Sequence, residues 1–428
     1  MKQRVAIIGT GIAGMATAYY LRTEYDVTLI EKNNYVGGHT NTVSVSLGGD
    51  SIPVDTGFMV YNDTTYPHLV RLFEELGVTS YDTSMSFGVR NVDRNLEYAC
   101  SGFSTFFAQR KNLINPVHWK LYRDILKFFR AADALIADEP FPDFSLSDFA
   151  GQYALSSQVM NDFVLPMAGA IWSTPGGEIR NFPALPLLRF MKNHQMLGVG
   201  IQLQWKTVEG GSNQYKEKLL AALPNKTLLS QNIKAIGQDA SCAYFYDEAG
   251  NKQNYDFIIV ATHADQALRL LESPSSLQSQ LLSAFQYNKN HVKLHSDASV
   301  MPHSKQAWAS WNVLNQTNAL GESMSSTHYW MNSLQNLDTK ENLFVSVDYP
   351  GSINPEKTYW QARYEHPRFD AAAISAQPRL PELNASGKIR FCGSYFRNGF
   401  HEDALWSALS VVDDLSNHKK HHHELVSV

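Results

Sequence analysis

The sequence predicts an α/β fold built on a parallel sheet, because short β-branched runs flank a glycine-rich turn and a helix at the N-terminus. Arg4–Ile8 and Asp26–Ile30 have the length and apolar character of buried parallel strands, and Ile12–Leu21 between them reads as a helix of small and apolar residues. Two similar runs, Phe257–Thr262 and Ile389–Ser394, occur much later. We therefore expect one sheet whose strands come from distant segments.

The turn after the first run predicts a Rossmann-like, dinucleotide-binding sheet. Gly9, Gly11 and Gly14 have the spacing G-x-G-x-x-G. Gly9 permits the tight turn, Gly11 lets a pyrophosphate approach the backbone, and Gly14 lets the helix pack against the strand. The helix N-terminus offers free N–H groups to the phosphates. Glu31 ends the second strand, where its carboxylate can accept hydrogen bonds from a ribose 2′-OH.

A second glycine pair favours FAD over NAD. Gly37 and Gly38 follow Glu31 by a few residues and precede His39. This stretch resembles the extended FAD signature of the flavin-containing amine oxidoreductase superfamily, in which an arginine is usual where His39 stands. Asp55-Thr56-Gly57 is similar to the segment of that family that lies beside the flavin ribityl chain.

The resemblance covers nearly the whole chain. It is closest to one branch of the superfamily, the bacterial FAD-dependent proteins encoded beside cyclopropane-fatty-acyl-phospholipid synthases. The stretches that resemble this branch are Gly37–Thr40, Val54–Phe58, Pro166–Pro175, His263–Leu268, Ala307–Asn312, Tyr329–Asn332 and Gly399–Asp403.

The resemblance implies a Rossmann-like FAD/NAD(P)-binding domain with an inserted, amine-oxidase-like α+β substrate domain. We expect the FAD-binding domain to comprise 1–80, 205–285 and 385–415, the substrate domain to comprise 86–204 and 286–384, and 416–428 to be a disordered tail. The residues expected to bind FAD are Gly9, Gly11, Ile12, Ala13, Gly14, Glu31, Lys32, Gly37, Gly38, His39, Thr56, Gly57, Ile233, Ala261, Gly393, Glu402, Asp403 and Ala404.

The catalytic residues are left as candidates. Amine oxidases of the superfamily typically place a lysine near flavin N5, and the best register puts His291 at that position, with Lys293 two residues later on the same strand face. Tyr329 and Trp330 could form an aromatic wall over the flavin or simply pack in the core. His401, in the closing motif, could steer a proton or only contact the cofactor.

Composition narrows the class of protein. The chain has 428 residues and a formal net charge of −5, which gives no global attraction to nucleic acid. Its three cysteines, Cys100, Cys242 and Cys392, are far apart, which suits a reducing compartment and gives neither a disulfide framework nor a cysteine zinc site. We expect no bound metal. No apolar run reaches transmembrane length, so the expected location is the cytoplasm.

Val117–Ile136 has the clearest helical pattern of the chain. Its apolar side chains fall on one half of a helical wheel, and Lys120, Arg123, Lys127 and Arg130 fall on the other. A basic amphipathic helix can lie on an anionic membrane surface. For this protein that surface would be the inner face of the membrane. The alternative is a surface helix that buries its apolar half in its own domain.

Together these features predict an FAD-dependent oxidoreductase, because flavin supplies a two-electron acceptor. The branch resemblance implies a hydrophobic substrate such as a modified fatty-acyl chain of a phospholipid, with a lipid methyltransferase as a partner. Two alternatives stay open: an FAD amine oxidase that forms aldehyde and hydrogen peroxide, and a non-catalytic flavin-binding partner of a lipid methyltransferase. The substrate, the electron acceptor and the oligomeric state are not predicted.

Overall fold

The structure is a computed structural model of the chain. It describes the backbone of residues 2–137, 144–172, 179–198, 203–223, 227–318, 320–321 and 323–426, with the side chains of the last helix described as far as Asn417.

The N-terminal unit forms as the sequence predicts, with β1 (Arg4–Ile8), α1 (Ile12–Leu21) and β2 (Asp26–Ile30). β1 lies at the centre of a five-stranded parallel sheet in the order β10-β2-β1-β14-β20. The remaining strands are β10 (Thr227–Leu228), β14 (Phe257–Val260) and β20 (Ile389–Phe391), and all five lie within the three segments assigned to the FAD-binding domain.

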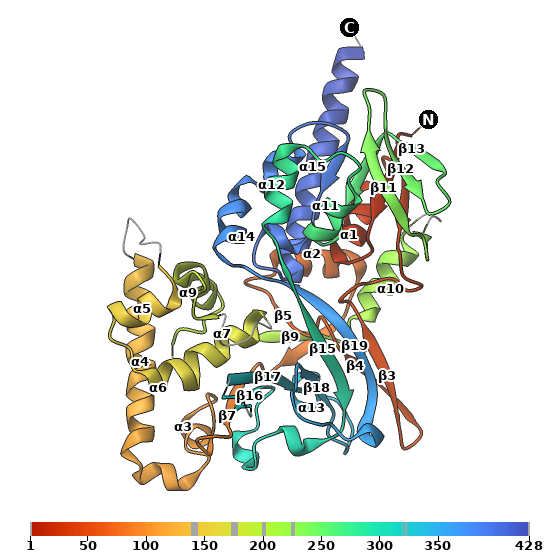
Figure 1. Cartoon of the computed structure of the whole chain (residues 1–428). Coiled ribbons are helices and arrows are strands. Elements are labelled where there is room, and N and C mark those ends of the chain that lie inside the picture. Colours follow the sequence, from red (N-terminus) through yellow and green to blue (C-terminus); the bar gives the residue numbers. More distant parts are fainter. Residues whose placement is uncertain are drawn as a thin grey trace.

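Helices α2 (Pro67–Leu76) and α15 (His401–Val426) pack with α1 in a common apolar core on one side of this sheet. Gly77 ends α2 in the left-handed conformation, as expected of a helix-terminating glycine. The segment 416–428 was predicted to be a disordered tail, but α15 continues through it as far as Val426. In Figure 1 this end of α15 projects upward from the molecule.

Other parts of the nucleotide-binding region surround the parallel sheet (Figure 1). An antiparallel sheet consists of β11 (Ile233–Gln238), β12 (Ala243–Asp247) and β13 (Lys252–Tyr255). The helices of this region are α10 (Asn213–Ala221), α11 (Ala264–Leu270) and α12 (Ser276–Ser283). Helix α14 (Ala371–Ala376) lies beside α12 in Figure 1, although its segment was expected in the substrate domain.

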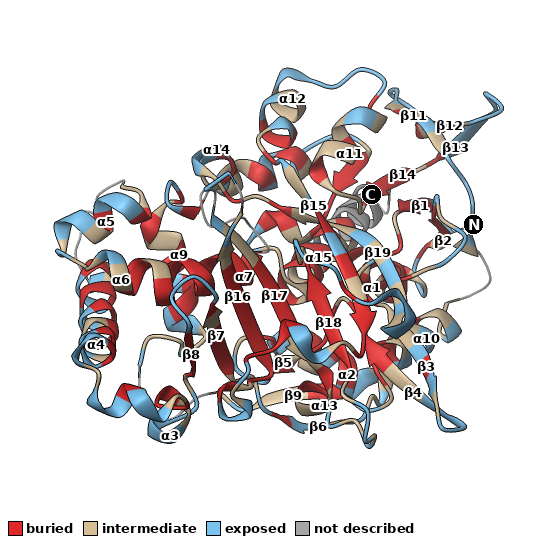
Figure 2. Ribbon diagram, turned by 60° about the horizontal axis from the view of Figure 1, so that its bottom comes forward, coloured by how far each residue is buried: buried red, intermediate tan, exposed pale blue. Residues whose placement is uncertain are grey.

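The inserted region is built on a seven-stranded sheet in the order β19-β15-β18-β17-β16-β7-β8, which is antiparallel except where β16 meets β7. Both insertions contribute strands to it. Figure 2 shows its central strands as the most continuously buried part of this region. The strands are β7 (Phe87–Asn91), β8 (Leu96–Ala99), β15 (Tyr287–His295), β16 (Trp311–Thr317), β17 (Ser323–Trp330), β18 (Phe344–Val347) and β19 (Thr358–Pro367).

The long antiparallel pair β15–β19 connects the two regions. At its first end Tyr287 accepts a hydrogen bond from the backbone N–H of Ala264 in α11, at 2.9 Å. Further along, Val292 and Leu294 pack against Val45 and Val54. These two valines belong to the hairpin of β3 (Thr42–Leu47) and β4 (Asp50–Asp55).

A helical layer covers the other edge of the seven-stranded sheet. It contains α3 (Phe103–Phe106), α4 (Pro116–Ala137), α5 (Leu146–Gln152), α6 (Ser157–Val159), the π-helical turn η2 (Met160–Val164), α7 (Leu165–Trp172) and α9 (Ala184–Asn193). Short elements complete the structure: α13 (Met331–Leu334), the sheet of β5 (Tyr61–Asn62), β9 (Trp205–Val208) and β6 (Ser80–Thr83), and the 3₁₀ turns η1 (Arg110–Ile114), η3 (Ala298–Val300), η4 (Lys305–Ala307), η5 (Pro355–Lys357), η6 (Gln377–Asn384) and η7 (Ser394–Phe396).

Helix α4 settles one alternative left open by the sequence. Leu121, Ile125, Phe128 and Leu135 are buried in the core of the helical layer. Most of the apolar half of the helix therefore faces its own region of the protein, whereas Val117 in the first turn is exposed. In the part of the chain that the structure describes, no helix combines the length and apolar character needed to cross a bilayer.

Candidate functional site

A cavity of about 900 Å³ lies where the parallel sheet meets the seven-stranded sheet. We call the part formed by Gly9–Ala13, Glu31–Asn33, Ala261–His263 and Gly393–Tyr395 the nucleotide half, because these segments follow the carboxyl ends of β1, β2, β14 and β20. Ligands of open α/β sheets bind at this edge. The apolar half is formed by Val60, Met85, Ala170, Ile171, Tyr329 and Leu334.

The glycine turn has the shape that a pyrophosphate requires. A Cβ at Gly14 would lie 2.0 Å from the carbonyl oxygen of Gly9, so only glycine permits this close approach of helix and turn. A Cβ at Gly11 would meet no protein atom within 4 Å, and Gly11 lines the cavity. Gly38 lies against Gly11, since its Cβ would be 3.4 Å from the Gly11 Cα. The turn thus leaves open space beside the backbone at Gly11.

Glu31 is fixed at the predicted end of β2. Its Oε2 accepts hydrogen bonds from the Thr10 hydroxyl at 2.5 Å and the Thr10 N–H at 3.2 Å. Its Oε1 accepts from the Asn33 N–H at 3.0 Å and from the Asn33 side chain at 2.8 Å. The carboxylate is buried and lines the cavity, so it is held ready to accept a ribose hydroxyl.

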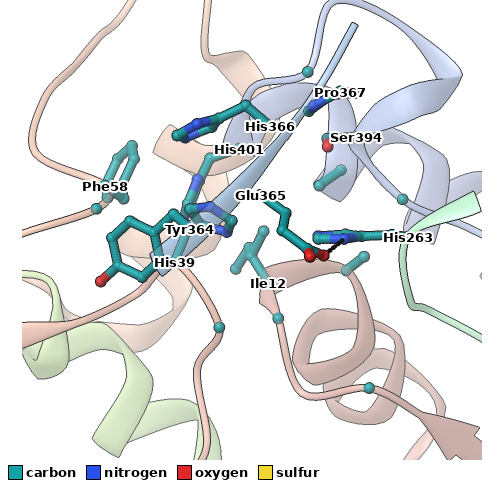
Figure 3. A pocket seen from close by; sticks show the side chains of 18 of the residues that line it. Ile12, His39, Phe58, His263, Tyr364, Glu365, His366, Pro367, Ser394 and His401 are labelled. Atoms are coloured by element: carbon teal, nitrogen blue, oxygen red, sulfur yellow. Dashed lines mark ion pairs between the residues drawn. The ribbon is translucent and has the colours of Figure 1, made fainter. Parts of the chain in front are cut away.

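His39 lies on the cavity with the rings of Tyr364 and His366 beside it, at centroid distances of 4.8 and 5.2 Å (Figure 3). Its Nε2 is buried and has no hydrogen-bond partner among the described residues. Burial and the neighbouring histidines lower the pKa of His39 well below its ordinary value, so the ring is neutral at neutral pH. It can give a bound cofactor a hydrogen bond, but not the positive charge of the usual arginine.

His401 is also held neutral on the cavity. Phe58 stacks on its ring at a centroid distance of 4.1 Å, and its Nε2 lies 3.1 Å from the Tyr215 hydroxyl and 3.4 Å from the Thr40 hydroxyl. Burial lowers the pKa of His401 to about 3. These contacts fix the ring and make it a poor proton acceptor.

A charged group at the nucleotide half was missed by the sequence analysis. His263, which precedes α11, forms an ion pair of 3.4 Å with Glu365 on β19 and stacks on Tyr287 at 4.4 Å. Figure 3 shows this pair near Ile12, at the start of α1. The hydrogen bond from His263 lowers the pKa of Glu365 to about 2. Lys289 lies directly opposite Glu365 in the register of β15 and β19.

Lys289, rather than His291 or Lys293, is the basic residue of β15 that lines the cavity. The side chains of these three residues lie on the same face of the strand, because they are two positions apart. The residue that lines the cavity is therefore two positions before the candidate His291, and this depends on the tertiary position of β15. The backbone N–H of His291 donates to Asp348 at 2.7 Å. Of the two aromatic candidates, Tyr329 lines the cavity, whereas Trp330 points away and donates to Asn342 at 3.0 Å.

The side chains of Glu402 and Asp403 serve the fold instead of lining the cavity. Glu402 accepts the backbone N–H groups of His68 at 3.1 Å and Leu69 at 3.0 Å, at the N-terminus of α2, where a carboxylate is favoured. Asp403 accepts the N–H of Phe400 at 2.9 Å. These contacts position the start of α15, and Ala404 in the same turn lines the cavity.

Most residues predicted to bind FAD meet on the cavity wall. Gly14 lies behind the glycine turn, and Thr56 bonds instead to the Tyr364 hydroxyl at 3.0 Å. Positions 173–175 of the motif Pro166–Pro175 lie outside the described residues. The predicted residues that line the cavity are Gly9, Gly11, Ile12, Ala13, Glu31, Lys32, Gly37, Gly38, His39, Gly57, Ile233, Ala261, Gly393 and Ala404.

The comparisons with known proteins agree with this site. Residues 12–336 match the model of the family described as flavin containing amine oxidoreductase, and the chain belongs to that family. It is therefore an FAD-dependent oxidoreductase. The open turn at Gly11, the carboxylate of Glu31 and the unpartnered Nε2 of His39 fit this cofactor.

The individual relatives share either a small part of their length or a low sequence identity with this chain. A carotenoid phi-ring synthase of Chlorobaculum tepidum is 32% identical over 179 residues, which is 38% of this chain but only 26% of that protein. The cyclohexylamine oxidase from Brevibacterium oxydans has a TM-score of 0.69 at 15% identity, covering 97% of this chain and 100% of that one. A CLA-producing fatty acid isomerase from P. acnes has a TM-score of 0.65 at 12% identity, covering 96% and 98%. These structures share the fold.

Proposed function

We propose that the protein oxidises a hydrophobic substrate, such as a modified fatty-acyl chain of a phospholipid. In this reaction the substrate would give up a hydride from one carbon and release a proton from the adjacent carbon to solvent, and would gain a double bond. Bound FAD supplies the acceptor for the two electrons. The cytoplasm, beside the inner membrane face, is the proposed location, and a lipid methyltransferase is the proposed partner.

The observation that carries this proposal is the apolar half of the cavity. Its wall consists of aliphatic side chains, one alanine and the phenol of Tyr329. Burial raises the pKa of Tyr329 to about 12, so the phenol is uncharged at neutral pH. An acyl chain can lose its contact with water against such a wall, at about 0.8 kcal/mol for each buried methylene. Among the described residues, the six that form the apolar half include no carboxylate to pair with a free ammonium group.

The residues of the chain bind and orient rather than react. His401 has a pKa too low to store a proton at neutral pH, so we assign it a positioning role beside Phe58 and Tyr215. The aliphatic wall excludes water from the reacting carbons. Two of the relatives named above, a fatty acid isomerase and a carotenoid synthase, carry names of hydrophobic compounds, which supports the proposed substrate class.

The alternative is an amine oxidase, and Lys289 is the observation that favours it. Its ammonium group lines the cavity, as the lysine of an amine oxidase would. Against this, Lys289 lies opposite Glu365, whose partner His263 belongs to the nucleotide half. The lysine is therefore placed toward the cofactor's nucleotide end rather than toward the apolar half.

The test is anaerobic reduction of the bound flavin, followed by its absorbance. We expect phospholipids with unsaturated, methylated or cyclopropane acyl chains to bleach the flavin, and a panel of primary amines to leave it oxidised. Bleaching by amines, with release of aldehyde in air, would establish the amine oxidase instead. A flavin that stays oxidised with both panels but is reduced by dithionite would favour the non-catalytic partner of a lipid methyltransferase.

A further inference from the structure

One corner of the inserted region exposes an unusual number of large apolar side chains. Ile114 is 89% exposed, Phe103 59% and Val117 56%, and Leu113 and Trp119 are exposed as well. These five residues come from α3, η1 and the first turn of α4, and we call them the apolar corner. Figure 1 places α3 and the start of α4 at the lower left, far from the parallel sheet. Clustered exposed apolar residues mark interaction surfaces.

The apolar corner is a contiguous and ordered surface. The rings of Phe103 and Trp119 both pack on Phe107, at centroid distances of 4.6 and 4.8 Å, and lie 6.1 Å from each other. The indole N–H of Trp119 donates to the carbonyl of Leu113 at 2.9 Å. The aromatic and aliphatic members are thus held side by side.

The segment that forms this corner carries basic but no acidic side chains. Between Glu97 and Asp124 the sequence contains no acidic residue, but it contains Arg110, Lys111, Lys120 and Arg123, and all four are exposed. Lys120 pairs with Asp124 at 2.5 Å. The remaining three cations form no ion pair with an acid among the described residues. A basic rim around an exposed apolar surface is complementary to anionic lipid headgroups above acyl chains.

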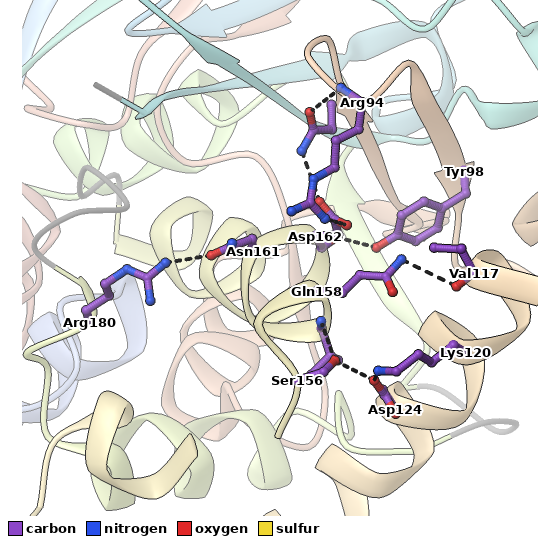
Figure 4. Close-up of polar contacts among 12 residues, drawn as sticks. Arg94, Tyr98, Val117, Lys120, Asp124, Ser156, Gln158, Asn161, Asp162 and Arg180 are labelled. Carbon is purple, nitrogen blue, oxygen red and sulfur yellow. Dashed lines mark hydrogen bonds and ion pairs between the residues drawn. The ribbon is translucent and has the colours of Figure 1, made fainter. Parts of the chain in front are cut away.

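The corner is anchored to the rest of the inserted region. Figure 4 shows Asp124 joined to both Lys120 and the Ser156 hydroxyl, and Gln158 donating to the backbone carbonyl of Val117 at 3.4 Å. On the inner side, His118 lies 2.9 Å from the carbonyl of Phe106. Because the inner side of α4 is fixed in this way, the exposed residues are presented on a rigid support.

We propose that the apolar corner inserts into the surface of an anionic phospholipid bilayer, with Arg110, Lys111 and Arg123 on the headgroups. The docking element is thus the end of α4 together with α3 and η1, and not the buried long face of α4. The proposal does not depend on which substrate the cavity takes. A membrane fits this corner better than a protein partner does, because basic residues without acidic neighbours in the segment suit a surface of uniform negative charge.

The experiment uses the full-length, FAD-loaded protein and vesicles of equal parts phosphatidylglycerol and phosphatidylcholine. We expect co-sedimentation at low salt that declines as salt rises, because the headgroup attraction is screened. Ile114→Glu should weaken binding by about tenfold or more, since it replaces an inserted apolar side chain with a charge that the headgroups repel. Lys111→Gln should weaken it by about fivefold at low salt. Leu320→Glu is the matched control, because Leu320 is 83% exposed and lies outside the corner. This variant should bind the vesicles as the wild type does.

A second measurement reports insertion directly. Phospholipids brominated in their acyl chains should quench part of the tryptophan fluorescence of the bound wild type, and Trp119→Phe should remove that part. Flavin absorbance and melting temperature equal to those of the wild type show that each variant is folded. The proposal is overturned if the wild type does not bind the vesicles at low salt, if Leu320→Glu and Ile114→Glu weaken binding equally, or if the corner variants instead change the oligomeric state.

Discussion

The two halves of the cavity are made of different parts of the polypeptide. The nucleotide half presents backbone, glycine and a few fixed polar groups such as Glu31, all within short segments that follow parallel strands. The apolar half presents side chains from α7, β17, α13 and loops that are distant in the sequence. Local sequence therefore forms the nucleotide half, whereas tertiary packing brings the residues of the apolar half together.

The largest effect is expected at the glycine turn. Gly14→Val should prevent formation of folded, FAD-loaded protein, because its Cβ alone would lie 2.0 Å from the Gly9 carbonyl oxygen. Overpacking typically costs about 1–3 kcal/mol, and a contact with backbone at this distance is expected at the upper end of that range or above it. Gly11→Ala is the contrasting variant, since its Cβ meets no protein atom within 4 Å.

Thermal unfolding and FAD titration separate these two glycines. We expect Gly11→Ala to melt as the wild type does without FAD, and to bind FAD about 5- to 150-fold more weakly, because the methyl group occupies space left for the cofactor. A Gly14→Val protein that melts within a few degrees of the wild type would contradict the close packing of α1 on the turn.

The second effect tests the apolar half. Ile171→Asp should lower the rate of flavin reduction by the hydrophobic substrate about 150-fold or more, because an unpaired charge in an apolar site costs about 3–5 kcal/mol. FAD affinity should stay within a few-fold of the wild type, since the substitution lies outside the nucleotide half. Ile171→Leu is the conservative control and should retain most activity. An equal loss of FAD binding and of activity would contradict the proposed division of the cavity into a nucleotide half and an apolar half.

The third effect concerns the seven-stranded sheet that carries the apolar half. His295 and His328 share the Ser346 hydroxyl, at 2.7 and 2.6 Å. Burial lowers the pKa of His295 to about 4 and that of His328 to about 3. The unfolded chain, with histidine pKa values near 6.5, takes up protons first as the pH falls, so stability declines below about pH 6.5 and continues to decline to about pH 3–4.

For each ring, the free energy of unfolding should be about 2 kcal/mol lower at pH 5 than at neutral pH. Urea unfolding at pH 7.5 and pH 5 measures this difference. In His328→Asn the difference should shrink by about 2 kcal/mol, whereas His291→Asn, at an exposed position of β15, should keep the wild-type difference. If His328→Asn keeps the full difference, the ring is not held neutral in the folded protein.

The smallest effect is expected at the ribose acceptor. Glu31→Gln keeps the shape of the side chain but removes its charge, so the hydrogen bonds from a ribose hydroxyl and from Thr10 are weakened rather than lost. FAD should bind about fivefold more weakly, which corresponds to about 1 kcal/mol. Equilibrium titration with FAD measures the change, and unchanged affinity would show that Glu31 serves only the turn.

The same division explains what the sequence could predict. The bounds of β1, α1 and β2 follow from residues less than thirty positions apart, and the structure agrees with them. The same short stretch places Glu31 on the cavity, where its contact with a ribose stays a prediction. The position of Lys289 on the cavity could not be read in this way, because three residues of one face of β15 are chemically similar candidates. Which of them reaches the cavity depends on where β15 crosses between the two sheets.

The closing motif and α4 show two further limits. Glu402 was expected to contact FAD, but its carboxylate lies at the N-terminus of α2, and no local pattern indicates that these helices meet. The amphipathic pattern of α4 predicted a helix correctly, yet the pattern alone could not tell a protein core from a membrane as the environment of its apolar half. The exposed corner became visible only when α3, η1 and α4 were placed together.

The strand order of the parallel sheet also has a consequence for biosynthesis. β1 pairs with β14, and β14 pairs with β20, so the sheet cannot be completed until residue 391 has left the ribosome. Until then β14 has an unpaired edge, and an exposed edge of apolar strands is prone to aggregation. Neither region is continuous in the sequence, and the protein is therefore expected to complete its parallel sheet and to bind its cofactor only after β20 has been synthesised.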